Sequence, residues 1–454
     1  MAIQTINPTT GKVAKTFIEH TNEEVLKMID DADSAFHKWR GTNFNLRSQL
    51  MKNAAQILRE CKKHYGKILT LEMGKPLTQA IAEVEKCAWV CDYYADNAEK
   101  ILSEEIIQTD ASQSYVRFDP IGIVLAIMPW NFPFWQVFRF ATPTLMAGNV
   151  CLLKHASNVP MSALAIEEIF IEAGFPKNTF KTLLIGSSLI KDVIDHPFVK
   201  AVTLTGSEQA GKNVAALCGS KLKKTVLELG GSDPFIVLED AEINEAVKTA
   251  VTARLINNGQ SCIAAKRFIV VEKVYNEFEK KFIDAMSKVK IGDPMNKETE
   301  LGPIAREDLL FELDDQIQKS VAKGANILCG GKRINRVGIY YEPTILANLN
   351  KGMPAYDEEI FGPVASLIKA KDEDDAIKIA NDSQFGLGAS LWTSDITKAK
   401  VLAGKIESGS VFINGMVKSD PRLPFGGIKN SGYGRELSHY GIKEFVNIKT
   451  VWIK

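Results

Sequence analysis

A cysteine and a glutamate, each set beside glycines, are the side chains of this sequence best suited to covalent catalysis. Cys262 ends the run Asn-Gly-Gln-Ser-Cys at residues 258–262, and Glu228 begins the run Glu-Leu-Gly-Gly at residues 228–231. A thiolate can attack an electrophilic carbon, and a carboxylate can activate the water that releases the product. Because a lone cysteine is commonly a small buried apolar residue, the pair needs support from the rest of the chain.

A second group of polar residues follows an apolar run that ends near Met128. Residues 129–133 read Pro-Trp-Asn-Phe-Pro, and the Asn131 amide could donate to a developing oxyanion. Trp135 and Arg139 lie four and eight residues beyond Asn131, near one face of a helix. Arg139 would pair with a substrate carboxylate if it faces a cleft. Otherwise it is a surface residue or part of an internal salt bridge.

Further residues suggest a dinucleotide site. Lys154 ends a strand and could bind a ribose or phosphate, and Ser157 leaves room for a 2′-phosphate where an acidic residue would repel it. This pair favours NADP over NAD, unless the two are unrelated loop residues. Gly206 and Ser207 open a helix after a strand, where backbone N–H groups could face a pyrophosphate. The run lacks Gly-x-Gly-x-x-Gly, so this signal is weak by itself.

Residues 358–363, Glu-Glu-Ile-Phe-Gly-Pro, place a carboxylate and an aromatic ring close together. Glu359 could bind a ribose and Phe361 could flank a nicotinamide. Taken alone, the segment is an acidic turn.

The elements that must position these residues form a doubly wound α/β pattern. Residues 22–100 have helical spacing, and buried strands are predicted at residues 121–128, 149–154, 180–185, 201–205 and 224–229, alternating with helices. A second α/β unit begins near residue 231. We expect a Rossmann-like cofactor domain (residues 1–109 and 121–230) and a catalytic domain (residues 231–419). Alternating strands at residues 113–118 and 446–454 fit neither core, so residues 110–120 and 437–454 are predicted to form a small β oligomerisation arm.

Composition excludes several classes of protein. In 454 residues, Lys plus Arg and Asp plus Glu number 55 each, which gives no reason to expect a nucleic-acid or anionic-membrane partner. The seven cysteines are not spaced like metal ligands, so no metal is expected. The N-terminus resembles neither a signal nor a transit peptide, and we expect a cytoplasmic protein.

Together with the glycine-rich residues 424–436, these motifs resemble, in order and spacing, the aldehyde dehydrogenase superfamily over essentially the whole chain. The resemblance implies that Cys262 is the nucleophile, Glu228 the general base, and Asn131 with the Cys262 backbone N–H the oxyanion hole. It implies a role in proton relay for Glu436. The cofactor positions that it implies are Met128, Trp130, Lys154, Ser157, Gly206, Ser207, Gly230, Glu359 and Phe361.

Within the superfamily the chain is similar to bacterial succinate-semialdehyde dehydrogenases of the compact, NADP-preferring branch. Arg139 matches the residue that binds the distal carboxylate, with Trp135, Ser261 and Ser419 as further substrate contacts. We therefore expect oxidation of succinic semialdehyde, or a similar ω-carboxy aldehyde, with NADP, and with NAD more weakly. The enzyme is expected to be a homodimer or a dimer of dimers.

Other functions remain open at this stage. One is a general aldehyde or glutarate-semialdehyde dehydrogenase that uses NAD. Another is an acylating enzyme that passes its thioester to coenzyme A, although Glu228 argues for hydrolysis. The last is a catalytically silent structural or binding protein of the same fold.

Overall fold

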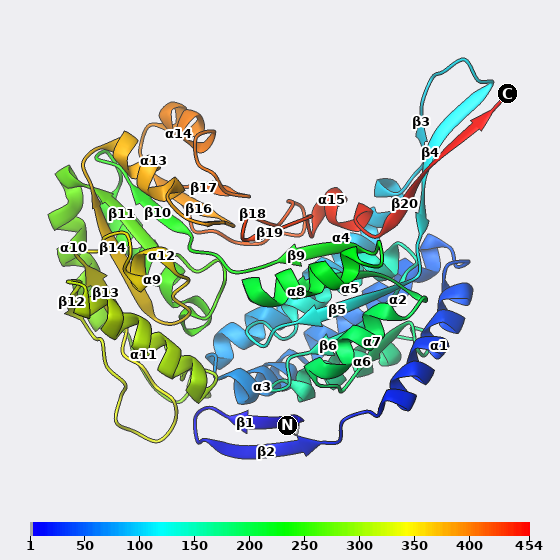
Figure 1. Ribbon diagram of the computed structural model, residues 1–454, viewed down its shortest axis with the longest axis horizontal. Coiled ribbons are helices and arrows are strands. Elements are labelled where there is room, and N and C mark those ends of the chain that lie inside the picture. The colour runs from blue at the N-terminus through cyan, green and yellow to red at the C-terminus, as the bar shows by residue number, and fades with distance from the viewer. Residues whose placement is uncertain (1–2) are drawn as a thin grey trace.

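Two parallel β-sheets, one in each lobe, organise the chain, and the computed structural model describes residues 3–454 (Figure 1). The first sheet has six strands in the order β19-β9-β8-β5-β6-β7. Its parallel strands are β5 (Ile123–Met128), β6 (Val150–His155), β7 (Phe180–Thr182), β8 (Val199–Thr205) and β9 (Lys224–Glu228), and β19 (Gly432–Tyr433) is antiparallel to β9. These strands are continuous apolar runs because helices cover both faces of such a sheet.

Helices surround the first sheet and make one large apolar core with it. The predicted helical region before residue 100 is confirmed, as α1 (Asn22–Trp39), α2 (Phe44–Glu60), α3 (Lys62–Met73) and α4 (Leu77–Ile101). Thr21 and Glu24 form a reciprocal capping box at the start of α1. The crossover helices are α5 (Trp135–Met146), α6 (Pro160–Glu172), α7 (Ile190–Asp195), which follows the 3₁₀ turn η1 (Ser187–Leu189), and α8 (Glu208–Gly219).

The second sheet has seven strands in the order β12-β13-β14-β11-β10-β16-β17, with a core on each face. Its strands are β10 (Pro234–Val237), β11 (Arg267–Val271), β12 (Asn326–Cys329), β13 (Thr344–Ala347), β14 (Val364–Ala370), β16 (Ala389–Trp392) and β17 (Val411–Ile413), and β12 alone is antiparallel to its neighbour. Its helices are α9 (Ile243–Leu255), α10 (Glu272–Ser287), α11 (Glu307–Ala322), α12 (Pro354–Asp357), α13 (Glu373–Asn381) and α14 (Ile396–Ala403). The short strands β15 (Phe385–Gly386) and β18 (Ile428–Lys429) pair with each other near the crossing between lobes.

The two strands that fit neither core pair with each other. In register, β4 (Gln113–Pro120) and β20 (Val446–Ile453) run antiparallel, and β3 (Glu105–Ile106) adds a third strand that the sequence did not indicate. Figure 1 shows this sheet projecting from the body with the C-terminus at its tip. The short helix α15 (Ser438–Lys443) precedes β20 and contacts α5.

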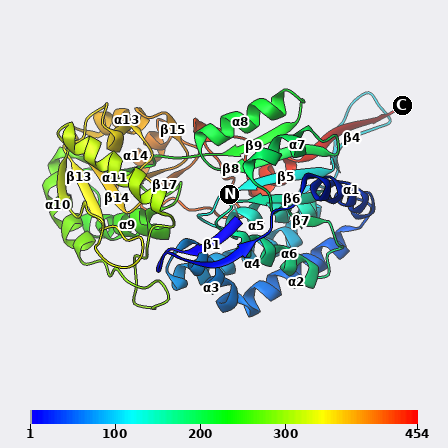
Figure 2. The same cartoon turned by 60° about the horizontal axis from the view of Figure 1, so that its bottom comes forward.

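A hairpin at the N-terminus was not predicted. Strands β1 (Ile3–Asn7) and β2 (Lys12–Phe17) form it, and β1 packs against α3 and α6 (Figure 2). The Thr5 hydroxyl donates to the Glu72 carboxyl at 2.7 Å, and burial raises the pKa of Glu72 to about 7. Over residues 3–454, no helix is both long and apolar enough to cross a membrane.

Candidate active site

Cys262 lies where two cavities meet. The first cavity has a volume of about 610 Å³, and its wall includes Trp135, Arg139 and Ser419. The second cavity has a volume of about 360 Å³, and its wall includes Trp130 and Glu359. Since Cys262 lines both, one thiol is accessible from two sides, which is the arrangement needed to bring two molecules to one sulfur.

A strained turn delivers the thiol to this junction. After α9 the chain forms the 3₁₀ turn η2 (Ile256–Gly259), in which Asn257, Asn258 and Gly259 have φ values of 57°, 58° and 74°. The Asn258 amide donates to the carbonyls of Gly74 and Pro303, both at 2.9 Å. Strained backbone of this kind persists only where surrounding contacts hold it, and it is common at active sites.

Asn131 is held with its amide beside this loop. Its Nδ2 donates to the Gln260 carbonyl at 3.1 Å, and its Oδ1 accepts from Nε2 of Gln136 at 3.0 Å. The Asn257 amide in turn donates to the Asn131 carbonyl at 2.8 Å. Because an amide nitrogen carries two hydrogens, one remains for an oxyanion. Gln136 fixes which end of the Asn131 side-chain amide faces the loop. No feature of the sequence had marked Gln136 as a site residue.

The thiol is not acidic at rest. Burial raises the pKa of Cys262 to about 12, while the positive charges of Arg139 and Lys266 act in the opposite direction. The thiol is therefore protonated near neutral pH, and it must lose its proton as the bond to the substrate forms.

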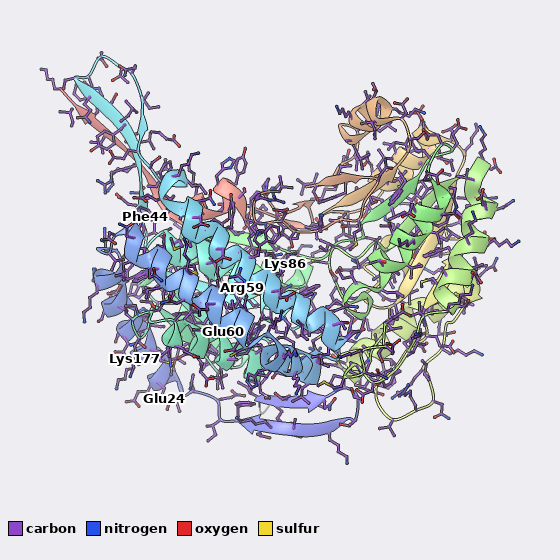
Figure 3. All side chains as sticks on the ribbon, turned by 180° about the vertical axis from the view of Figure 1, so that it is seen from behind. Glu24, Phe44, Arg59, Glu60, Lys86 and Lys177 are labelled. Carbon is purple, nitrogen blue, oxygen red and sulfur yellow. The ribbon has the colours of Figure 1, made fainter. Side chains whose placement is uncertain are left out.

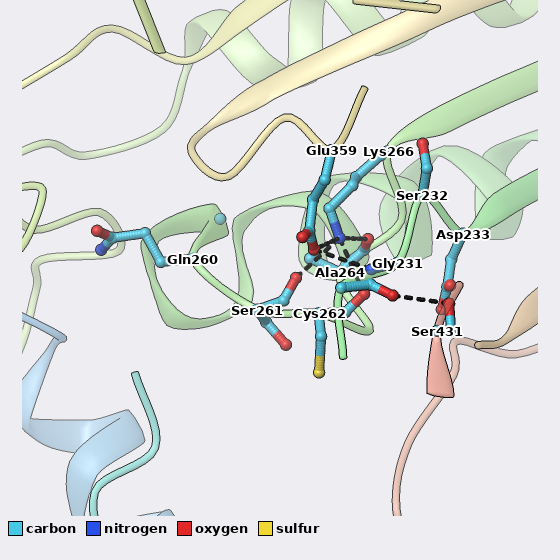
Figure 4. Close-up of polar contacts among 12 residues, drawn as sticks. Gly231, Ser232, Asp233, Gln260, Ser261, Cys262, Ala264, Lys266, Glu359 and Ser431 are labelled. Carbon is cyan, nitrogen blue, oxygen red and sulfur yellow. Dashed lines mark hydrogen bonds and ion pairs between the residues drawn. The ribbon is translucent and has the colours of Figure 1, made fainter. Parts of the chain in front are cut away.

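Lys266 supports the back of the nucleophile loop (Figure 4). Its ammonium donates to the carbonyls of Ser261 and Cys262, both at 2.9 Å, and lies 3.3 Å from a Glu359 oxygen. Figure 4 shows the Cys262 sulfur pointing away from this cluster. Lys266 thus joins the nucleophile loop to a residue predicted to bind the cofactor, and no motif in the sequence indicated this connection.

Glu228 ends β9 and is buried, but its side chain lines neither cavity among the described residues. A Cβ atom placed on Gly426 would lie 2.6 Å from its Oε1, so the carboxyl group faces that glycine. Burial, and then the nearby Glu436, raise the pKa of Glu228 well above its usual range. To act on a molecule bound at Cys262, the carboxyl group must rotate out of this position.

The predicted substrate residues Trp135, Arg139, Ser261 and Ser419 all line the first cavity. Arg139 also makes an internal salt bridge, because its Nε contacts the buried Glu436 carboxylate. Arg139 therefore faces the cavity, as expected of a residue that pairs with a substrate carboxylate, and also forms an internal salt bridge. The Glu436 carboxylate neutralises part of its charge.

The predicted cofactor residues divide into two groups. Those that line the second cavity are Trp130, Gly206, Ser207, Gly230, Glu359 and Phe361. The rings of Trp130 and Phe361 meet edge to face at 5.8 Å, and Ser207 caps α8 by accepting from the Ala210 N–H. A Cβ atom on Gly230 would lie 2.3 Å from a Glu359 oxygen, so any larger residue there would displace the Glu359 side chain.

The second group lies outside this cavity. Met128 is buried at the end of β5, and Lys154 and the exposed Ser157 lie at and just beyond the end of β6. The buried His155 side chain contacts the carbonyls of Met128 and Pro133, and burial lowers its pKa to about 4. A neutral His155 therefore ties the 129–133 turn to the end of β6.

These residues fit a dinucleotide. The ligands of doubly wound sheets bind just beyond the carboxyl ends of the strands. The predicted cofactor residues at or after β5, β6 and β8 lie at these ends. The N-terminus of α8 opens on the second cavity beside Gly206 and supplies backbone N–H groups for a phosphate.

The model of the aldehyde dehydrogenase family matches residues 1–451. The chain belongs to this family. A Synechocystis sp. protein named probable succinate-semialdehyde dehydrogenase (NADP⁺) is 53% identical over 453 residues, which cover 100% of both chains. Succinate-semialdehyde dehydrogenase (NADP⁺) 1 of Mycobacterium bovis is 50% identical, again over 100% of both chains.

Solved structures agree with this family membership. Succinic semialdehyde dehydrogenase from Streptococcus pyogenes, in complex with NADP⁺, superposes with a TM-score of 0.98 at 42% identity, covering 100% of both chains. The predicted α/β fold and the family resemblance are therefore confirmed. In residues 3–454, no group of three or more His, Cys, Asp or Glu side chains is arranged to hold a metal ion.

Proposed function

We propose that this protein oxidises succinic semialdehyde to succinate with NADP⁺ and water. The observation that carries the proposal is the single thiol shared by two cavities. Cationic side chains line one of them, and dinucleotide-binding elements line the other. The names of the full-length relatives from Synechocystis sp. and Mycobacterium bovis support the same substrate and cofactor.

In the proposed mechanism Cys262 adds to the aldehyde carbon. A carbon–sulfur bond forms, the thiol proton leaves to a base, and the Asn131 amide with the Cys262 backbone N–H stabilises the alkoxide. The bound cofactor supplies a hydride acceptor, and loss of hydride leaves a thioester on Cys262.

Glu228 then removes a proton from water, and the water oxygen forms a bond to the thioester carbon. The carbon–sulfur bond breaks, so succinate leaves and the thiol is restored. We assign Glu436 to keeping Arg139 in place and to passing the proton onward from Glu228. In its buried position the raised pKa of Glu228 favours the protonated form, so the carboxyl group must turn toward the thioester and lose that proton before it acts as a base.

We assign the cofactor to the second cavity and to the ends of β5 and β6. Trp130 and Phe361 would flank its nicotinamide end, Glu359 would bind a ribose, and Gly206 and Ser207 would face the pyrophosphate. Lys154 and Ser157 would meet the far ribose and its 2′-phosphate. Ser157→Glu should shift the preference toward NAD, and retained NADP preference would mean that other residues select the cofactor.

We also propose the domain division expected above, with residues 231–419 as the catalytic domain and the β4–β20 sheet as an arm that joins subunits. The separate sheets of the two lobes and the exposed position of the arm support this division.

The test is a kcat/KM panel on the purified protein. Succinic semialdehyde, glutaric semialdehyde and butanal are each assayed with NADP and with NAD, with and without coenzyme A. We expect succinic semialdehyde with NADP to be best, free succinate as the product, and no dependence on coenzyme A. Cys262→Ala should lower kcat by at least about 10³-fold, and unchanged turnover in that variant would remove the mechanism.

A further inference from the structure

The first cavity contains more positive charge than Arg139 alone. Its wall includes the basic side chains of Lys86, Arg139, Lys297 and Lys418. Any of them could attract a carboxylate, so the neighbours of each one decide which is available.

Three of these cations are either paired or exposed. Arg139 contacts Glu436, so part of its charge is already paired. Lys297 and Lys418 are exposed, and water and salt screen exposed charges. These two could attract a carboxylate from solution without holding it firmly.

Lys86 differs because the groups that its ammonium contacts are neutral. The ammonium donates to the Ser419 hydroxyl at 2.7 Å and lies 4.3 Å from the centre of the Trp135 ring. Lys86 is partly buried on α4, which crosses the middle of the molecule (Figure 3). Burial, and then the positive charge of Arg139, lower the pKa of Lys86 to about 8.

The nearest carboxylates are already engaged by other groups. Glu83 forms an ion pair with Lys75 and accepts from the backbone N–H groups of Phe134 and Trp135. Asp420 pairs with Arg422 at 2.7 Å. A cation kept from water without a counterion is costly, and an arriving carboxylate would remove that cost.

We infer that Lys86, with Ser419 and Trp135 beside it, binds the distal carboxylate of the substrate and so selects ω-carboxy aldehydes. The Lys86 ammonium forms the ion pair, the Ser419 hydroxyl orients it, and Trp135 packs against the lysine. Arg139, which Glu436 keeps in place, lines the same cavity and adds positive charge near Cys262. This inference deepens the proposed function and depends on it for the identity of the aldehyde.

The kinetic test compares succinic semialdehyde with butanal, both with NADP. Lys86→Met keeps the length of the side chain and removes its charge. It should lower kcat/KM for succinic semialdehyde about 10- to 100-fold, mainly through KM, and leave butanal within about threefold. Lys86→Arg should restore most of the loss, because it returns the charge. Lys297→Met, which removes an exposed cation at the same cavity, is the matched control and should have little effect on either aldehyde.

A binding measurement tests Lys86 without turnover. Calorimetry with succinate should show binding to the wild type, and binding about 10- to 100-fold weaker to Lys86→Met. The inference is overturned if both proteins bind succinate equally, if neither binds it, or if Lys86→Met loses butanal activity as strongly. Binding of succinate through Lys86 in an enzyme with no preference for carboxylated aldehydes would overturn both the proposed substrate and the selectivity assigned to Lys86, and would leave only the carboxylate-binding site standing.

Discussion

At the residue scale, the reactivity of Cys262 comes from its surroundings. A thiol with a pKa near 12 is a poor nucleophile at neutral pH. The groups that can change this are close by: the Asn131 amide for the alkoxide, and the positive charges of Arg139 and Lys266. Activation therefore depends on stabilising the product of attack more than on a preformed thiolate.

Asn131 provides a direct test of this view. Asn131→Ala should lower kcat about 10²- to 10³-fold with little change in KM, because the amide hydrogen that Gln260 does not use acts on the developing alkoxide. Stopped-flow measurement of the first NADPH formed would locate the loss in the step before hydrolysis. Gln136→Ala leaves that amide present but free to turn over, so a smaller loss is expected. Equal and full activity in both variants would contradict the oxyanion role.

The pH dependence of substrate preference follows from Lys86. Its charge is present below its pKa of about 8 and is lost as the pH rises through that value. Since kcat/KM reports the free enzyme, the ratio of kcat/KM for succinic semialdehyde to that for butanal should be constant below about pH 7 and fall above pH 8. Taking the ratio cancels the ionisation of Cys262, which affects both aldehydes.

Burial is the largest cause of the lowered pKa of Lys86. Among the charged and titratable groups around it, Arg139 lowers this pKa further, and Cys87, Glu83 and Asp420 raise it. Lys86→Arg should keep the ratio flat to about pH 10, since arginine stays charged there. A ratio in the wild type that does not change between pH 6 and 10 would contradict the assignment.

The sequence was informative about residues that belong to distinctive runs and silent about the rest. Cys262, Asn131 and Glu359 lie in short runs that contain glycine, proline or tryptophan, and these runs could be recognised. Other residues lie in stretches of sequence with ordinary helical or strand-like patterns, among them Lys86, Gln136 and Lys266. Their importance depends on which side chains the fold brings near them. Arg139 was noticed, but its partner Glu436 lies almost 300 residues away, so the salt bridge could not be foreseen.

At the element scale, the turn η2 is the part of the chain on which the site most depends. It joins α9 to Cys262 through left-handed residues, and contacts from both lobes hold it, including those of Asn258 to Gly74 and Pro303. Helix α9 ends at Leu255 because Asn257 and Asn258 adopt left-handed conformations that tertiary hydrogen bonds stabilise.

Gly259→Ala tests how rigid this turn must be. Gly259 has a φ of 74°, and a Cβ atom there would lie 2.3 Å from the Gly362 carbonyl. Strain and overlap should together cost about 2–4 kcal/mol, which lowers the thermal midpoint and reduces kcat/KM for every aldehyde. Differential scanning fluorimetry and the standard assay measure the two effects.

Gly219→Ala is the matched control for this substitution. Gly219 ends α8, and a Cβ atom placed on it would have no neighbour within 4 Å, so alanine should be neutral or slightly stabilising there. A Gly259→Ala protein as stable and active as this control would mean that the turn tolerates movement.

Strand prediction succeeded where apolar runs were long. It located the five parallel strands of the first sheet, although β7 covers only three of the six predicted residues. It missed the β1–β2 hairpin, because β2 is mostly exposed and has no apolar side to recognise. The strands β4 and β20 lie more than 300 residues apart and were expected together in one arm because their alternating patterns fitted neither core.

At the scale of the whole molecule, the projecting sheet of β3, β4 and β20 is the feature whose role the fold of one subunit does not explain. Ile448 and Trp452 of β20 are 62% and 49% exposed, which is unusual for large apolar side chains on a strand. The Asn149 amide donates to the Phe445 carbonyl at 2.7 Å and fixes the base of the arm to the first lobe. A firmly based sheet with exposed apolar side chains is suited to contact with another subunit.

If the arm joins subunits as proposed, removing residues 446–454 should lower the mass of the protein to that of a monomer, measured by light scattering coupled to size-exclusion chromatography. Since the truncation could also unfold the arm, a double substitution, Ile448→Asp with Trp452→Asp, keeps the strand and removes only its apolar surface. It should have the same effect on mass while far-ultraviolet circular dichroism stays unchanged. Wild-type mass in both proteins would show that the arm does not join subunits.

The meeting of two cavities at Cys262 also suggests a route to selective inhibitors. A compound with a thiol-reactive centre could extend one branch into each cavity, and each branch would raise the effective concentration of the other. A carboxylate on the branch toward Lys86 would favour this enzyme over relatives that act on uncharged aldehydes. An aromatic group on the other branch could pack against Trp130 and Phe361 in the second cavity and exclude the nicotinamide ring.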